Sequence, residues 1–287
     1  MNSIPPLDLT QQYKFIGEEV NAAVLEVLAS GRYIGGSPVE QFEQQFAQYV
    51  GTSTCIACNS GTDALYLALR ALGIGAGDEV ITTPFTFVAT AETVSAVGAI
   101  PVFVDINPNT FNLDLEQVAA AITDRTKAII PVHLFGQPVD MTQLMAIAER
   151  RNLWVIEDCA QATGASWSGA KVGSIGHIGC FSFFPTKNLG ACGDAGAVTT
   201  NDQMLAAKVR MIRDHGQRER YLYEEVGINS RLDAIQAAIL LIKLRHLDTW
   251  NTQRQTVADH YNQLLQPLPK IQRPQSIAGG ESVWNQY

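Results

Sequence analysis

Lys187 lies in the segment FSFFPTKNLG, directly after an apolar run and among Gly and small residues. Desolvation and a nearby cation favour the neutral amine of a lysine, and a neutral amine can attack an aldehyde to form a Schiff base. Most lysines, however, are solvated at the protein surface. This segment alone therefore leaves open both a reactive and an ordinary lysine.

A second segment, EDCAQ, follows the apolar run 153–156 and places Asp158 at the C-terminal end of a predicted strand. A carboxylate there can keep a pyridine nitrogen protonated, which makes the ring an electron sink for a carbanion. Gln161 is close enough to reach a neighbouring ring substituent. The ordinary alternative for Asp158 is a carboxylate that caps the following turn.

A third segment, NSGTDAL from Asn59, follows a β-type run and opens a predicted helix. A helix start presents unpaired N–H groups and the positive end of the helix dipole, so it can hold a phosphate. Gly61 permits close approach, and Ser60 and Thr62 add hydroxyl donors. The alternative is a plain N-cap by Asn59 or Ser60.

The elements around these segments predict an α/β fold with a mostly parallel central sheet flanked by helices. Helical patterns at 115–122 and 141–151, the latter behind Asp140 as N-cap, alternate with β-rich runs. These runs are 80–83, 102–105, 128–133, 154–158, 179–184 and 197–200. Because ligands of such sheets bind outside the carboxyl ends of the strands, the three segments are expected to meet there.

Several segments resemble, in their amino-acid sequence and in their order along the chain, those of the sugar aminotransferases of the DegT/DnrJ/EryC1/StrS family. These are pyridoxal-phosphate (PLP) enzymes of fold type I. The resemblance covers nearly the whole chain. Its segments are SGRYIGGSPVEQFE from Ser30, NSGTDAL from Asn59, PFTFVATAE from Pro84, EDCAQA from Glu157, FSFFPTKNLG from Phe181, GDAGAV from Gly193 and GINSRLDAIQAAIL from Gly227.

The resemblance implies a role for each matching residue. Lys187 would hold PLP as a Schiff base, Asp158 would pair with the pyridine nitrogen, and Gln161 would bond near the ring oxygen. A further set would complete the cofactor site: Phe87 stacked on the ring, Gly61, Thr62 and Ser182 on the phosphate, and Asn229 reaching the phosphate from a partner subunit. The last role implies a homodimer with shared active sites.

Residue chemistry alone would make Phe87 a core aromatic and Asn229 a turn residue. His133 and His215 also lie in family-like segments, but we expect both to be structural histidines.

The implied reaction moves an amine from glutamate or another amino acid to a keto-sugar linked to a nucleotide diphosphate, in amino-sugar and polysaccharide biosynthesis. The segments RDHGQRERY and GINSRLDAIQAAIL favour a 3-keto over a 4-keto sugar. One alternative is a PLP-dependent sugar dehydratase, although those relatives carry histidine where this chain has Lys187. The other is a non-catalytic PLP-binding regulatory protein.

The composition agrees with a folded, water-soluble protein: 46% of residues are hydrophobic, 17% are charged, and the formal net charge is −8. An acidic chain gives no electrostatic support for nucleic-acid binding. No apolar run is long enough to span a bilayer, and residues 1–9 lack the pattern of a secretory signal. Five scattered cysteines indicate reduced thiols, so we expect a cytoplasmic protein.

Cys55 and Cys58 have CxxC spacing, but no second pair or histidine pair completes a metal site. We therefore expect core cysteines and no metal.

Two domains are expected. Residues 1–245 would form a large PLP-binding α/β domain with an N-terminal arm, and the amphipathic pattern at 232–250 would lead out of it. Residues 246–287 would be the start of a small C-terminal domain that is incomplete by comparison with the family. Within it, 282–287 looks like the beginning of a strand.

Overall fold

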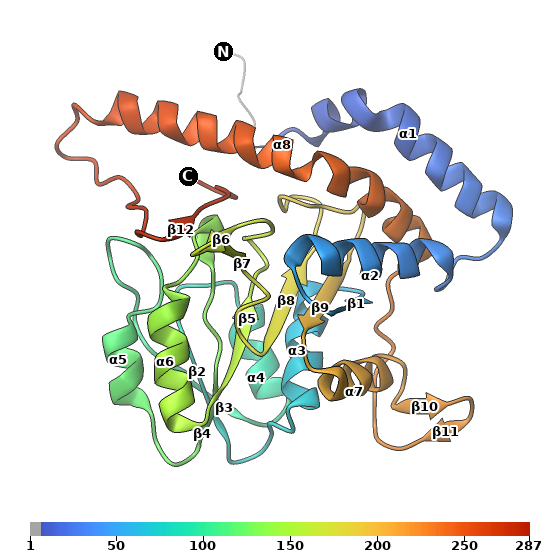
Figure 1. The fold of residues 1–287 in the computed structure, drawn as a ribbon, viewed down its shortest axis with the longest axis horizontal. Coiled ribbons are helices and arrows are strands. Elements are labelled where there is room, and N and C mark those ends of the chain that lie inside the picture. Colours follow the sequence, from blue (N-terminus) through green and yellow to red (C-terminus); the bar gives the residue numbers. More distant parts are fainter. Residues whose placement is uncertain (1–6) are drawn as a thin grey trace.

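A seven-stranded sheet forms the centre of the chain in a computed structural model that describes residues 7–287 (Figure 1). Residues 1–6 of the expected first domain lie outside the described part. In spatial order the strands are β1 (Thr54–Cys58), β9 (Gly196–Thr200), β8 (Ile178–Ser182), β5 (Trp154–Asp158), β4 (Thr126–Ile129), β2 (Glu79–Thr82) and β3 (Ile100–Phe103).

The strand pairings confirm the expected mostly parallel sheet, with one exception. Strands β8, β5, β4, β2 and β3 pair in parallel, whereas β9 is antiparallel to both of its neighbours, β8 and β1. Consequently β1 points the same way as β8. The strands other than β9 therefore end at one edge of the sheet, and β9 begins there.

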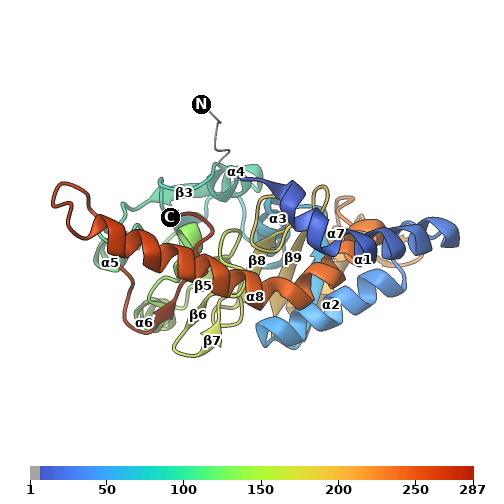
Figure 2. The same ribbon diagram turned by 90° about the horizontal axis from the view of Figure 1, so that it is seen from above.

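Helices cover both faces of the sheet, as the two views show (Figures 1 and 2). Alternate side chains of each strand enter different cores: Ile56 and Cys58 of β1 join one cluster, and Cys55 and Ala57 join another. The first face carries α3 (Gly61–Ala71), α4 (Ala89–Ala96) and α7 (Gln203–Arg213); the second carries α2 (Ser37–Val50), α5 (Leu115–Ala121) and α6 (Met141–Arg151).

Asp140 caps α6 as expected, since its side chain accepts a hydrogen bond from Gln143 N at 2.9 Å.

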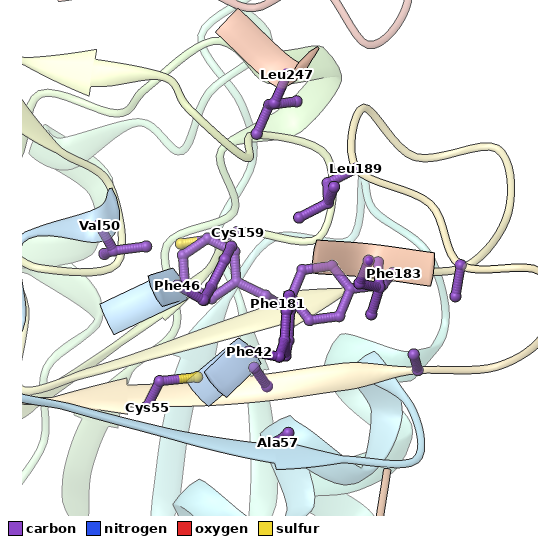
Figure 3. Packing of buried hydrophobic residues seen from close by; sticks show 14 of the residues in the cluster. Phe42, Phe46, Val50, Cys55, Ala57, Cys159, Phe181, Phe183, Leu189 and Leu247 are labelled. Atoms are coloured by element: carbon purple, nitrogen blue, oxygen red, sulfur yellow. The ribbon is translucent and has the colours of Figure 1, made fainter. Parts of the chain in front are cut away.

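Four phenylalanines form the centre of the core between α2 and the sheet (Figure 3). Phe46 meets Phe181 edge to face with ring centroids 5.0 Å apart, and Phe42 meets Phe183 in the same way at 5.4 Å. Such edge-to-face pairs each add roughly 0.5–1.5 kcal/mol beyond the area that they bury. Phe181 and Phe183 thus fix the end of β8 immediately before the loop of Lys187.

Helix α8 (Ala234–Leu265) crosses one end of the sheet, with α1 (Leu9–Ser30) beside it (Figures 1 and 2). It continues well past the expected 232–250 because no proline or glycine interrupts the chain before Pro267. The expected domain boundary at 245/246 therefore falls inside one continuous helix. No helix among residues 7–287 has the length and apolar character needed to cross a membrane.

The C-terminal segment differs from the expectation of a strand at 282–287. The strand β12 lies just before it, at Gly280–Glu281, and pairs with β6 (Ser166–Trp167). Residues 283–285 instead hydrogen-bond to the turn η1 (Leu134–Gly136), whose irregular backbone offers no regular ladder. The remaining short strands are β7 (Ala170–Lys171), β10 (Gln217–Glu219) and β11 (Leu222–Tyr223).

Side chains occupy the outer edge of β1, where an edge strand would otherwise leave backbone groups unpaired. Ala57 N donates to Glu43 at 2.9 Å, Arg210 donates to Cys55 O at 3.2 Å, and Arg213 donates to Ala57 O at 2.8 Å. Both arginines also form ion pairs with Glu43, at 2.8 and 2.9 Å. Helices α2 and α7 thereby close this side of the sheet.

Candidate active site

A cavity of about 420 Å³ opens at the sheet edge where β1, β5 and β8 end. It brings the three chemically promising segments together. Seven of the expected site residues line it: Gly61, Thr62, Phe87, Asp158, Gln161, Ser182 and Lys187. The eighth, Asn229, does not line the cavity; it is exposed and forms an isolated bridge with Asp214.

The start of α3 forms one wall of the cavity. Ser60 is the N-cap, since its Oγ accepts a hydrogen bond from Asp63 N at 3.1 Å. The plain cap and the phosphate site therefore coexist, because the N–H groups of Gly61 and Thr62 have no acceptor within the helix and remain available to an anion. A Cβ on Gly61 would lie 2.5 Å from Ser182 Cβ, so only glycine allows α3 to approach the end of β8 so closely.

Asp158 ends β5 and is buried, with one donor on each carboxylate oxygen. Thr90 Oγ1 donates to Oδ2 at 2.8 Å, and Ala160 N donates to Oδ1 at 3.1 Å. Burial raises the pKa of Asp158, and the bond from Thr90, followed by the bond from Ala160, opposes that rise because each favours the charged form. A buried carboxylate held in this way suits a protonated ring nitrogen as its partner.

Sequence reasoning missed Thr90 and its neighbour Thr86. The two hydroxyl oxygens lie 3.0 Å apart, and both residues line the cavity, so they form a short chain that ends at Asp158. The signal was the presence of two threonines four residues apart in PFTFVATAE, where a bend at Thr86 leads into α4. The same segment carries Phe87, which is 69% exposed at the cavity wall and is therefore available for stacking.

Lys187 lies in a turn directly after β8, where Lys187 N donates to Phe184 O at 2.9 Å. Burial lowers the pKa of Lys187, and the carboxylate of Asp158 acts in the opposite direction. The lowered pKa increases the neutral amine that Schiff-base formation needs. Among residues 7–287, Lys187 is the one Lys or Arg side chain that lines this cavity.

The amide of Gln161 has its orientation fixed by the backbone. Phe135 N donates to Gln161 Oε1 at 2.8 Å, so the NH₂ group of the same amide is the part left to donate into the cavity. A donor at this place fits the phenolic oxygen of PLP. The donor set as a whole, with an anion site, a carboxylate, an amine and an amide donor, matches the groups around the ring of that cofactor.

His133 is structural, as expected. Val139 N donates to Nδ1 at 3.0 Å, so Nε2 carries the proton and faces Glu157 at 3.0 Å. The side chains of His133, Glu157 and Cys159 lie close enough to hold a metal ion, but both ring nitrogens of His133 are already engaged.

Cys55 and Cys58, which have CxxC spacing, are buried core residues.

Comparison with known proteins identifies the family to which this fold belongs. Residues 14–287 match the DegT/DnrJ/EryC1/StrS aminotransferase family. The chain is 48% identical to a UDP-2-acetamido-2-deoxy-3-oxo-D-glucuronate aminotransferase of Pseudomonas aeruginosa, over 98% of this chain and 78% of that protein. It is 49% identical to a "pleiotropic regulatory protein" of Geobacillus stearothermophilus, over 99% of this chain and 77% of the other.

The crystal structure of DesV from Streptomyces venezuelae in complex with a ketimine intermediate is similar to this structure. The TM-score is 0.98, the identity is 46%, and the match covers 99% of this chain and 77% of DesV. The chain thus spans about three quarters of the length of these relatives.

Proposed function

The chain belongs to the DegT/DnrJ/EryC1/StrS family of PLP-dependent aminotransferases, and we propose that it aminates a keto-sugar linked to a nucleotide diphosphate. The amine comes from an amino acid such as glutamate, and the product serves amino-sugar and polysaccharide biosynthesis. The observation that carries this proposal is the convergence of Lys187, Asp158 and the start of α3 on one cavity.

When bound, PLP supplies an aldehyde that takes up the amine and a ring that delocalises negative charge. In this proposal Lys187 would hold the cofactor through Nζ, and its free amine would move the proton at the carbon that carries the transferred nitrogen. Asp158 would keep the ring nitrogen protonated, and Gln161 would donate to the ring oxygen. Phe87 would stack on the ring, while Gly61, Thr62 and Ser182 would hold the phosphate.

Position 3 of the sugar is favoured over position 4. Two observations support this preference. The name of the relative from Pseudomonas aeruginosa specifies a 3-oxo sugar, and the segments RDHGQRERY and GINSRLDAIQAAIL resemble those of enzymes that aminate a 3-keto sugar. Lys187 favours amine transfer over dehydration, because the related dehydratases carry histidine at that position. We place the reaction in the cytoplasm, since all five cysteines are free thiols.

We also propose that a second copy of the chain completes the site. The cofactor phosphate and the substrate diphosphate are anionic, yet Lys187 is the one Lys or Arg that the described residues of a single chain bring to the cavity wall. The hairpin β10–β11 projects from the body (Figure 1), and on and beside it Tyr221, Leu222, Tyr223 and Val226 are exposed. We propose a homodimer in which Asn229, which follows this hairpin, reaches the cofactor phosphate of the partner.

The first experiment is a spectral titration of the purified protein loaded with PLP. Borohydride reduction followed by peptide mapping is expected to label Lys187 and to leave Lys127, exposed on β4, unlabelled. In a separate sample that has not been reduced, glutamate is expected to convert the lysine-bound cofactor to its amine form, and a 3-keto nucleotide sugar to restore it. A non-catalytic regulatory protein would bind PLP without responding to glutamate; this alternative is kept because the Geobacillus relative is named a pleiotropic regulatory protein.

A further inference from the structure

The residue after Lys187 is held in one orientation by three hydrogen bonds. The buried Asn188 donates through Nδ2 to Asn251 Oδ1 at 2.8 Å and to Val283 O at 2.9 Å, and its Oδ1 accepts from Asn285 Nδ2 at 2.9 Å. Both protons and the oxygen of this amide are therefore used. Residues 283–285 thus contact the loop that carries Lys187, and none of them lines the cavity.

The same residues also contact the turn that orients Gln161. Asn285 N donates to Phe135 O at 2.8 Å, and Val283 N donates to Gly136 O at 3.1 Å. Phe135 has a φ of +58°, an uncommon conformation for a non-glycine residue, and its own N–H holds Gln161 Oε1.

Gly136 allows the segment to approach this turn. A Cβ on it would lie 2.9 Å from Trp284 N and 3.0 Å from Asn285 N, and its φ is +98°. Residues 283–285 therefore support the strained turn through its carbonyl groups, while Gln161 engages it from the cavity side.

From these two sets of contacts we infer that Asn285 is a positioning residue of the cofactor site. Its side chain fixes Asn188, beside the lysine that binds the cofactor, and its backbone N–H fixes Phe135, which orients the Gln161 amide. One residue thereby sets the relative placement of Lys187 and Gln161. Asn285 is not among the residues that line the cavity, so it acts through these neighbours. The inference rests on the roles proposed above for Lys187 and Gln161.

Other contacts hold the Lys187 loop in place independently of Asn285. Along one stripe of α8, Lys243 Nζ donates to Gly190 O at 2.7 Å, and Gln236 Oε1 accepts from Cys192 N at 2.8 Å. Removing the Asn285 side chain should therefore change the alignment of the loop without unfolding it. The predicted defect is local and should appear in the properties of the bound cofactor.

The test compares Asn285→Ala and the isosteric Asn285→Asp with Gln286→Ala. The aspartate variant lacks the N–H group that donates to Asn188 Oδ1. Gln286 is the exposed neighbour of Asn285, and its replacement by alanine serves as the control because it removes a side chain but keeps the backbone. The Kd for PLP is expected to rise about threefold to tenfold in both Asn285 variants, as for the loss of one or two hydrogen bonds between neutral groups.

The bond from the Asn285 side chain to Asn188 also anchors residues 283–285, so its loss should loosen their backbone bonds to the turn that orients Gln161. The pKa of the lysine–cofactor Schiff base, read from a pH titration of visible absorbance, is therefore also expected to rise. A hydrogen-bond donor stabilises the negative charge of the phenolic oxygen most when the imine nitrogen is unprotonated. An aligned Gln161 therefore favours the unprotonated Schiff base and keeps its pKa low. The Gln286 control should leave both quantities unchanged. In the cofactor-free protein, hydrogen exchange should become faster at residues 134–137 and 184–190 together in Asn285→Ala.

A double variant makes the test decisive. If Asn285 acts through Asn188, Asn188→Ala combined with Asn285→Ala should weaken PLP binding no further than Asn188→Ala alone. Additive effects, or an Asn285→Ala protein that matches the Gln286 control, would overturn the inference. These results are informative only if wild-type protein labels at Lys187; labelling of another lysine would refute the proposed site assignment instead.

Discussion

Thr90 Oγ1 donates a 2.8 Å hydrogen bond to Asp158 Oδ2, and both residues are buried. This contact favours the charged carboxylate against a burial that raises the pKa of Asp158. We therefore predict that Thr90→Val, which keeps the shape but removes the hydroxyl, raises this pKa further. Hydrogen bonds to charged groups contribute about 1.5–3 kcal/mol, so the half-reaction with the amino donor should slow by about tenfold or more.

The pH profile of that half-reaction is the measurement. In Thr90→Val its acid limb should move to higher pH, and Thr90→Ser, which restores a hydroxyl, should recover most of the rate. An unchanged profile in the valine variant would show that Ala160 N alone suffices to hold Asp158 ionised.

The raised pKa of Asp158 also predicts how the stability of the cofactor-free protein depends on pH. Between the ordinary value of 3.8 and the folded-state pKa, the folded protein holds an extra proton, so the free energy of unfolding falls as pH rises through this window. At pH values above this window Asp158 is charged in the folded protein, and the burial of that charge lowers the free energy of unfolding by its full amount. Asp158→Asn removes this cost, so at pH 7 the cofactor-free variant should melt at a higher temperature than the wild type.

A gain of about 2–4 °C would correspond to roughly 1 kcal/mol in a chain of this size. The same variant should bind PLP more weakly, because the ring nitrogen loses its anionic partner. Calorimetric scans of both proteins without cofactor, from pH 5 to pH 8, would check the prediction. A wild type at least as stable as the variant at pH 7 would contradict it.

Gly61→Ala should disrupt the phosphate site by steric means. The added Cβ would lie 2.5 Å from Ser182 Cβ, and overpacking of this kind costs about 1–3 kcal/mol, so the Kd for PLP should rise by about fivefold or more. Gly75→Ala is a matched control, since its Cβ would have an ordinary 3.6 Å contact with Val97 O. Equilibrium dialysis of PLP with both variants measures the difference, which should be absent if α3 does not hold the phosphate.

Mixing two inactive variants tests whether Asn229 acts across subunits. In a Lys187→Ala chain paired with an Asn229→Ala chain, one site loses both residues and the other keeps both. If half of the dimers are mixed, about a quarter of the wild-type activity should return. Restored turnover after co-refolding is the measurement. Lack of recovery in demonstrated mixed dimers would place Asn229 in the site of its own chain.

Much of the fold was predictable because its signals are local. The runs at 154–158 and 141–151 coincide with β5 and α6, where periodicity and the Asp140 cap agree. The antiparallel direction of β9 was missed because a fully buried strand is a short apolar run whether it is parallel or antiparallel to its neighbours. The roles of Lys187, Asp158 and Gly61 were predicted from local motifs, and those of Phe87, Ser182 and Asn229 only from the family resemblance. Thr90 and Asn285 instead act through contacts 68 and 97 residues distant in sequence, which no local pattern reveals.

The closure of β1 by Glu43, Arg210 and Arg213 limits how the sheet could take part in aggregation. An edge on which Ala57 N, Ala57 O and Cys55 O already have partners is a poor template for an added strand, so growth of this sheet by strand addition should favour the opposite edge, at β3. Two molecules that joined through their β3 edges would present only sealed β1 edges to solvent. Such association would stop at a pair, and the sheet would not extend into a fibril.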